Sequence, residues 1–216
     1  MAESLQFLGF ITIIENARLG LIGGYLVLNH AGRPVEFHCT TPVRANRAQE
    51  ILYGATLKPF LYGEQIAQTL VQKAKIKPDV IFADISQVLT LQDFTDIPVV
   101  FVPSNAKSVP KLKITLLSNS DFEENCNGSI GESPETLENG EKYPYSISEQ
   151  LAEVPGLINT RWSEQKIASQ RVAVPEISNH SVKKTVAGLE TVSHAIDFTE
   201  PFVRIRLAIE EAQKAA

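Results

Sequence analysis

The N-terminal part of the chain consists of apolar runs separated by short polar breaks, a pattern typical of consecutive β-strands. Residues 5–15, 19–30 and 34–41 are rich in Phe, Ile, Leu, Val and Tyr, and the breaks fall at residues 16–17 and 32–33. Strands joined by such short breaks pair with their neighbours in antiparallel fashion. The pattern therefore predicts a meander of three antiparallel strands.

The second break also predicts a register for the strands that it joins. Gly32 suits the first position of a two-residue type II′ turn that pairs Ala31 with Pro34. That turn sets Leu28 opposite Phe37, and side chains on alternate positions then share a face. We expect the more apolar face to be the core face, because a sheet must bury an apolar side. This face comprises Leu26, Leu28, His30, Val35, Phe37 and Cys39.

Beyond the meander the apolar spacing becomes helical. A short helix is expected near residues 48–54 and a longer one from about Pro59, which Pro78 ends. Short apolar strands follow at residues 79–84 and 98–103. Continuous apolar strands separated by helices are typical of parallel strands that are covered on both faces. The longer helix carries its apolar stripe on Ile66, Ala67, Leu70, Val71 and Ala74.

These elements predict an α/β fold near the border of the α+β class, with one mixed sheet. The sheet is antiparallel in its N-terminal meander and parallel in the βαβ-type units that follow, with helices on both faces. Residues 1–118 form the predicted core domain. Residues 119–142 are acidic and poor in large apolar side chains, which predicts a disordered insert or linker. Residues 143–216 are predicted to form a helical C-terminal part docked on the core, with one short strand near residues 172–177.

Charge and composition narrow the classes of partner. The formal net charge is −5, and residues 119–142 account for −6 of it (seven acidic residues against one lysine), which leaves about +1 for the rest. A nearly neutral body does not favour strong nucleic-acid binding. The N-terminus lacks a signal peptide and no apolar run is long enough to cross a bilayer, so we expect a cytoplasmic protein without a membrane partner.

The sequence does not match several common binding-site and catalytic motifs. The glycines of residues 20–24 match neither a dinucleotide-binding nor a P-loop spacing, and glycines inside a strand more often allow close packing. His30, His38 and Cys39 fall on two faces of the predicted sheet and cannot converge on one metal ion. No nucleophile motif is present. With neither a phosphate-binding loop nor a metal cluster, no cofactor-binding site is predicted.

The order of the elements, three antiparallel strands and then helix, strand, helix and strand, resembles the ribonuclease H-like fold over about the first 105 residues. The resemblance implies that the first strand pairs with the fourth in parallel. It also implies acidic groups on these two strands that hold a divalent metal for phosphoryl transfer. Glu15 and Asp84 end the two strands here, and Glu64 or Glu200 is a candidate for a further ligand.

Two functions follow. The interpretation favoured by the absent motifs is a non-catalytic intracellular module without a cofactor, which binds an unidentified protein partner or a second copy of itself. The alternative is a Mg²⁺- or Mn²⁺-dependent nuclease or related phosphoryl-transfer enzyme, with Glu15, Asp84 and Glu64 as catalytic candidates and Glu15 and Asp84 as metal ligands. The separation of the Glu15 and Asp84 carboxyl groups distinguishes them.

Overall fold

The computed structural model describes residues 5–103, 147–152, 154–155, 157, 160–176 and 182–214. The acidic segment at residues 119–142 lies outside these residues, as does the apolar run at residues 112–117, whose pattern predicts a further strand. The structure of both stays a prediction.

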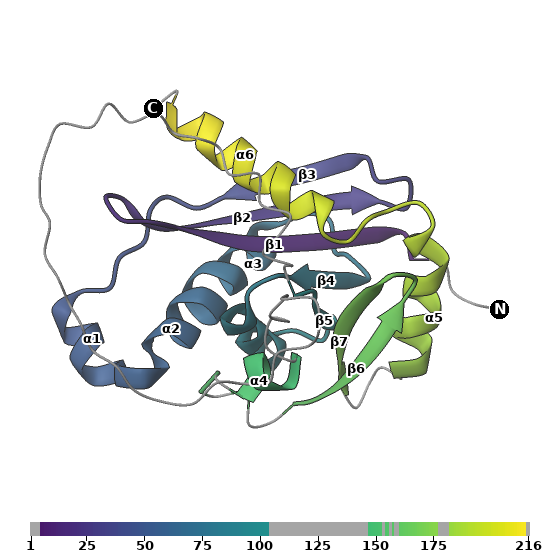
Figure 1. Cartoon of the computed structure of the whole chain (residues 1–216). Helices are drawn as coiled ribbons and strands as arrows, with labels where there is room; N and C mark the ends of the chain where they lie inside the picture. The colour runs from purple at the N-terminus through teal and green to yellow at the C-terminus, as the bar shows by residue number, and fades with distance from the viewer. Residues whose placement is uncertain are drawn as a thin grey trace, which may run out of the picture. The chain divides into compact units, whose positions relative to one another are not determined.

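Seven strands form one mixed sheet in the order β3-β2-β1-β4-β5-β7-β6 (Figure 1). The pairs β1–β2 and β2–β3 are antiparallel, whereas β1–β4 and β4–β5 are parallel. The predicted α/β fold is therefore confirmed, and the first strand pairs with the fourth as the ribonuclease H-like order implies. The strands are β1 (Phe7–Asn16), β2 (Gly20–Asn29), β3 (Pro34–Cys39), β4 (Val80–Ala83), β5 (Val99–Phe101), β6 (Arg161–Ile167) and β7 (Gln170–Glu176).

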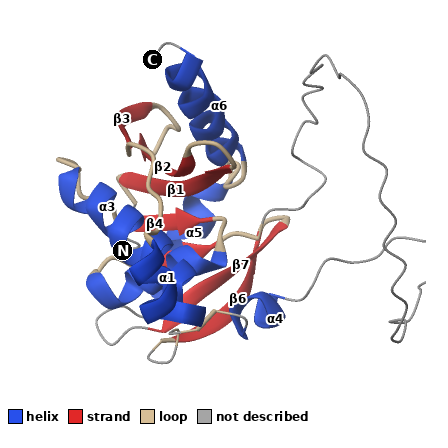
Figure 2. Cartoon of the chain, turned by 90° about the vertical axis from the view of Figure 1, so that its left-hand side faces the viewer, coloured by secondary structure: helices blue, strands red, loops and turns tan. Residues whose placement is uncertain are grey.

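Helices cover both faces of this sheet (Figures 1 and 2). On one face α6 packs on β1 and β2 while α5 packs on β6 and β7, and on the other the segment from η2 to α3 packs on β2. The described helices are α1 (Arg47–Tyr53), η1 (Gly54–Thr56), α2 (Leu57–Pro59), the π-helix η2 (Phe60–Gln68), α3 (Thr69–Lys73), the 3₁₀-helix η3 (Ser86–Phe94), α4 (Ile147–Ala152), α5 (Val182–Ser193) and α6 (Glu200–Lys214). Among these residues no helix is long and apolar enough to span a bilayer.

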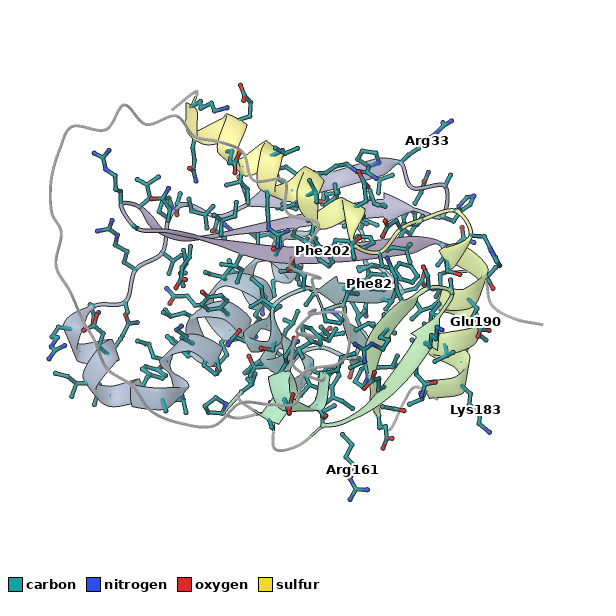
Figure 3. The ribbon with its side chains drawn as sticks, in the orientation of Figure 1. Arg33, Phe82, Arg161, Lys183, Glu190 and Phe202 are labelled. Carbon is teal, nitrogen blue, oxygen red and sulfur yellow. The ribbon has the colours of Figure 1, made fainter. Side chains whose placement is uncertain are left out.

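The core lies on both sides of the central strands. One apolar cluster joins β1, β2 and β4 to η2 and η3, and the other joins the same strands to α5 and α6. The second cluster is built on aromatic rings: Phe10 stacks on Phe82 and Phe82 on Phe198, each pair with ring centroids 4.8 Å apart. Phe202 meets Phe10 edge to face (Figure 3 labels Phe82 and Phe202). These contacts fix the start of α6 against β1 and β4.

The predicted register between the second and third strands is wrong by two residues. Phe37 pairs with Leu26 and not with Leu28. The turn is longer than two residues, because the Asn29 side chain accepts a hydrogen bond from the backbone N–H of Arg33. From Glu36 to Cys39 this slip of two residues keeps each side chain on its predicted face, whereas a bulge between Val27 and Leu28 shifts the pairing of Pro34 by one further residue.

The expectation of a single core face is also corrected. Tyr25 and Val27, on the face opposite to the expected core face, are fully buried in the cluster that includes the π-helix η2. Val35 and Phe37, expected in the core, are 42% and 39% exposed on β3, which is an edge strand of the sheet. The pattern of the meander gave the alternation correctly, but it could not show which strands have a helix on each side.

Two adjacent glycines in β2 allow helices to approach from both faces. A Cβ atom at Gly23 would lie 3.0 Å from Leu70 Cδ1 and closer still to Ile66 Cγ2. A Cβ atom at Gly24 would lie 2.8 Å from Ile209 Cδ1. The close-packing role predicted for these glycines is therefore confirmed, and it brings α6 down onto β2.

The C-terminal part contributes strands as well as helices. The β6–β7 hairpin extends the sheet, because β7 pairs antiparallel with β5 through Ala173 and Phe101. The strand predicted near residues 172–177 corresponds to β7. Its partner, Arg161–Ile167, was not predicted, since most of its residues are polar and only Ile167 is buried. Ahead of α6, Asp197 accepts hydrogen bonds from the backbone N–H and the hydroxyl of Thr199.

We expect Gly24→Ala to lower the free energy of unfolding by about 1–3 kcal/mol, because the new methyl group would overlap Ile205 and Ile209. Urea unfolding measures the change. The same substitution in an Ile205→Ala background should cost less, because Ile205→Ala removes the nearest obstructing methyl group. An equal cost in both backgrounds would show that the approach of α6 does not depend on this contact.

Glu36 on β3 ties the edge of the sheet to the chain that follows α3. Its carboxylate accepts hydrogen bonds from the backbone N–H groups of Lys75 and Ile76, both at 2.9 Å, and contacts His38 Nε2 at 2.7 Å. These three contacts lower the pKa of Glu36 to about 2. The hydrogen bond from the Lys75 backbone contributes most to this shift, followed by the His38 contact and the hydrogen bond from Ile76.

This lowered pKa predicts an acid-sensitive contribution to stability. The contribution is fully present above about pH 4.5, the ordinary pKa, and is lost as the pH falls towards about 2. Glu36→Gln should therefore be less stable than the wild type at neutral pH and should lose less stability on acidification, as measured by urea unfolding across that range. Glu50→Gln, which removes the same charge from an exposed pair with Arg47, is the control and should leave the pH dependence unchanged.

Candidate functional site

A pair of polar residues lies where β1 and β4 run side by side near their carboxyl ends. Ile11 pairs with Ala83 in the parallel ladder, so the next residues, Thr12 and Asp84, lie level with one another. Side chains alternate along a strand, so Thr12 points to the same face as Phe10, the face that α6 covers. The contact of Asp84 with α6 places its carboxylate on that face too.

Asp84 is the one charged residue in the buried class among the residues that the structure describes. Its side chain is 1% exposed, and its Oδ2 atom is paired with the guanidinium of Arg206 on α6, whose side chain is 29% exposed. The neighbouring residues Ile205 and Ile209 pack over Gly24. The close approach of α6 to β2 thus brings Arg206 to the carboxylate.

Burial raises the pKa of Asp84, and four smaller influences oppose it. The positive charge of Arg206 lowers the pKa most, followed by the nearby Thr12 hydroxyl, the hydrogen bond from Arg206 and the backbone N–H of Asp84. Thr12 Oγ1 and Asp84 Oδ1 are both buried, and neither makes a hydrogen bond of ordinary geometry with a residue that the structure describes. The site therefore holds unused hydrogen-bonding capacity inside the core.

Glu15 does not join this site. It lies three positions beyond Thr12 on β1, so its side chain leaves the opposite face of the sheet and is exposed. There it meets Tyr62 of the π-helix η2. Burial, the charge of Glu15 and a hydrogen bond to Glu15 raise the pKa of Tyr62 to about 12, in that order of importance. The structure therefore does not bring Glu15 and Asp84 together.

The remaining candidates also lie apart from Asp84. Glu64 is half-buried in η2, which packs on the face of the sheet opposite to α6. Glu200 is exposed at the start of α6, where Arg204 Nε donates to its carboxylate at 2.8 Å. Across the described part of the chain, no three His, Cys, Asp or Glu side chains are grouped to hold a metal ion.

The residues around Asp84 do not fit a divalent cation. Mg²⁺ and Mn²⁺ favour an octahedral set of oxygen ligands, whereas one carboxylate and one hydroxyl are available here. The carboxylate is also paired with a guanidinium, whose charge would repel a metal ion. Glu15, which the resemblance suggested as the second ligand, lies on the other face.

Thr12 and Arg206 were not among the residues expected at the site, although the sequence carries a signal for each. Thr12 is a polar residue in the middle of an apolar strand, where buried polar groups are the informative ones. Arg206 is four positions after Phe202 and three before Ile209, so it shares the apolar face of α6. A charged residue on such a face indicates a buried partner.

No protein-family model and no curated protein matches the sequence. Two solved structures with a similar arrangement are endonucleases V. One, from Ciona intestinalis, is in complex with a 23mer DNA that contains an inosine followed by a ribo-adenosine; it is 11% identical, with a TM-score of 0.39 over 86% of this chain and 76% of that chain. The other, human endonuclease V, is 11% identical, with a TM-score of 0.35 over 97% of this chain and 86% of that chain.

These findings correct two expectations. The favoured interpretation, a non-catalytic module that binds a protein partner or a second copy of itself, is wrong, because the similar solved structures are nucleases. The expectation that strong nucleic-acid binding is not favoured is wrong for the same reason, since one of these nucleases is bound to DNA. The earlier expectation rested on net charge and absent motifs, neither of which reports on strand order.

We expect Arg206→Met to lower the free energy of unfolding by about 3 kcal/mol at neutral pH, because it leaves the Asp84 carboxylate buried without its counter-ion. A carboxyl group whose folded pKa is raised destabilises the fold as the pH rises through that pKa, and removing the cation raises this pKa further. The loss should therefore shrink on acidification, when Asp84 takes up a proton, and urea unfolding across a pH series measures it.

Arg204→Met is the matched control, because it removes the same charge from an exposed pair on the same helix. It should cost less than about 1 kcal/mol with little dependence on pH. A loss in Arg206→Met that stays constant from neutral to acidic pH would show that Asp84 is not the group left uncompensated.

Proposed function

We propose that this chain binds nucleic acid and acts on its phosphodiester linkages, with Asp84 and Arg206 at the centre of the site. The observation that carries the proposal is the buried carboxylate at the end of β4, beside the parallel strand β1. In the ribonuclease H-like fold, that place holds an acidic group used in phosphoryl transfer. The support is the position of this residue and not the weak overall likeness to the endonucleases V.

The energetics of the site favour a functional reason for the Asp84–Arg206 pair. A buried ion pair is often no more stabilising than apolar residues of the same volume. Here the pair interrupts an otherwise aromatic and aliphatic cluster, built on Phe10, Phe82 and Phe202. Titratable groups with perturbed pKa values at the carboxyl ends of parallel strands are candidates for ligand contact. A binding role therefore explains a pair that stability alone does not require.

The chemistry of the residues suits a phosphodiester. The planar guanidinium of Arg206 matches phosphate oxygens and keeps its charge at every physiological pH. In phosphoryl transfer the protein contributes mainly positioning and stabilisation of negative charge on the phosphoryl oxygens. Asp84 holds the guanidinium in place, and the Thr12 hydroxyl lies beside the carboxylate. The cytoplasmic location that the sequence predicts stays a prediction.

The test is binding and cleavage of labelled oligonucleotides. We expect the protein to raise the fluorescence anisotropy of a labelled oligonucleotide, whether single-stranded DNA, duplex DNA or RNA. The affinity should fall as the salt concentration rises. Asp84→Asn should weaken binding and any cleavage seen on gels, because it removes the charge that positions Arg206. Asp96→Asn, on an exposed residue, is the matched control and should behave as the wild type. Absence of binding to every probe at low salt would refute the proposed function.

A further inference from the structure

The Asp84 site differs from a metal centre because the positive charge beside its carboxylate is a side chain, the guanidinium of Arg206. Ribonuclease H-like proteins place acidic groups on the first and fourth strands to hold a divalent metal. Here the first-strand position level with Asp84 is the neutral Thr12, and α6 delivers the guanidinium of Arg206 to the remaining carboxylate. One negative and one positive charge balance, and a divalent cation would add two uncompensated charges in a buried place.

We propose that the Arg206 guanidinium takes the place of the divalent metal and contacts a phosphate of the nucleic-acid backbone directly. The site would then bind its ligand without Mg²⁺ or Mn²⁺. This inference rests on the proposed function for its ligand, but its statement about metal can be tested separately.

The geometry of Arg206 allows it to face two partners. A guanidinium carries five N–H donors, and Arg206 uses Nη2 for Asp84 Oδ2. Its other donors have no hydrogen-bond partner that the described residues supply. The Arg206 side chain is 29% exposed and that of Asp84 is 1% exposed, so Arg206 is the member of the pair that is open to solvent. The arrangement is one in which the buried carboxylate orients the donor and the exposed edge binds the anion.

The position of the guanidinium is fixed by packing on either side of it. Ile205 and Ile209 lie against β2 at Gly24, and Phe202, one turn earlier, packs on Phe10. By contrast, Arg204 on the same helix is held by Glu200 and donates to the backbone oxygen of Gly32. Arg204 is thus a cation of the same helix that is committed to structural contacts, which makes it the comparison for Arg206.

The experiment measures oligonucleotide binding by fluorescence anisotropy in EDTA and in Mn²⁺, together with calorimetric titration of the protein with Mn²⁺ alone. We expect the same affinity of the wild type in both buffers and no saturable Mn²⁺ binding. Arg206→Gln should weaken binding by about tenfold or more, the loss of a charge-assisted contact. Arg204→Gln should change the affinity by less than about twofold.

If Arg206→Gln alone does not fold, the double variant Asp84→Asn with Arg206→Gln removes both charges, leaves no uncompensated carboxylate, and should bind as weakly. Circular dichroism and thermal unfolding establish that each variant is folded. Three results would overturn the inference: binding abolished by EDTA, Mn²⁺ binding by the wild type that Asp84→Asn removes, or equal affinities for Arg206→Gln and Arg204→Gln. A wild type that binds no oligonucleotide overturns the proposed function and the phosphate contact together, whereas the Mn²⁺ titration still decides whether the guanidinium excludes a metal.

Discussion

Two adjacent glycines in β2 allow helices to contact the same strand from opposite sides, and the rest of the structure depends on that approach. Gly23 receives Ile66 and Leu70 from the η2–α3 segment, and Gly24 receives Ile205 and Ile209 from α6. With both faces covered, β1, β2 and β4 become buried on each side, and two apolar clusters replace the single core of a half-exposed sheet. The same approach places Arg206 over the carboxyl end of β4.

The packing of α6 on the sheet also determines the surroundings of the Asp84–Arg206 ion pair. An aromatic cluster that fixes α6 also creates the low-dielectric surroundings that raise the pKa of Asp84 and make its counter-ion necessary. Elsewhere the described ion pairs are exposed or local, such as Arg204 with Glu200. A charge in the core is therefore confined to the place where the fold brings parallel strands and a helix face together, which is also where open α/β sheets bind ligands.

Local patterns in the sequence predicted most of the elements but not all of their relations. Alternation identified the meander and continuous apolar runs identified β4 and β5, because these signals depend on the period of each strand. The register of β3 was missed by two residues, since Asn29 stabilises a longer turn than the one that Gly32 suggests. The strand β6 was missed because its polar residues lie at the edge of the sheet, where burial imposes little alternation.

The sequence by itself determined the α/β class, the N-terminal meander and the presence of Asp84 at the end of a buried strand, because each follows from the residue pattern along a continuous segment. Only the tertiary structure decided the partners of that carboxylate. Glu15, near in strand order, lies on the opposite face because side chains alternate, whereas Arg206, 122 residues away, reaches Asp84 through the packing of α6 on β2. Contacts across such a separation depend on how helices seat on the sheet, and no local pattern encodes that.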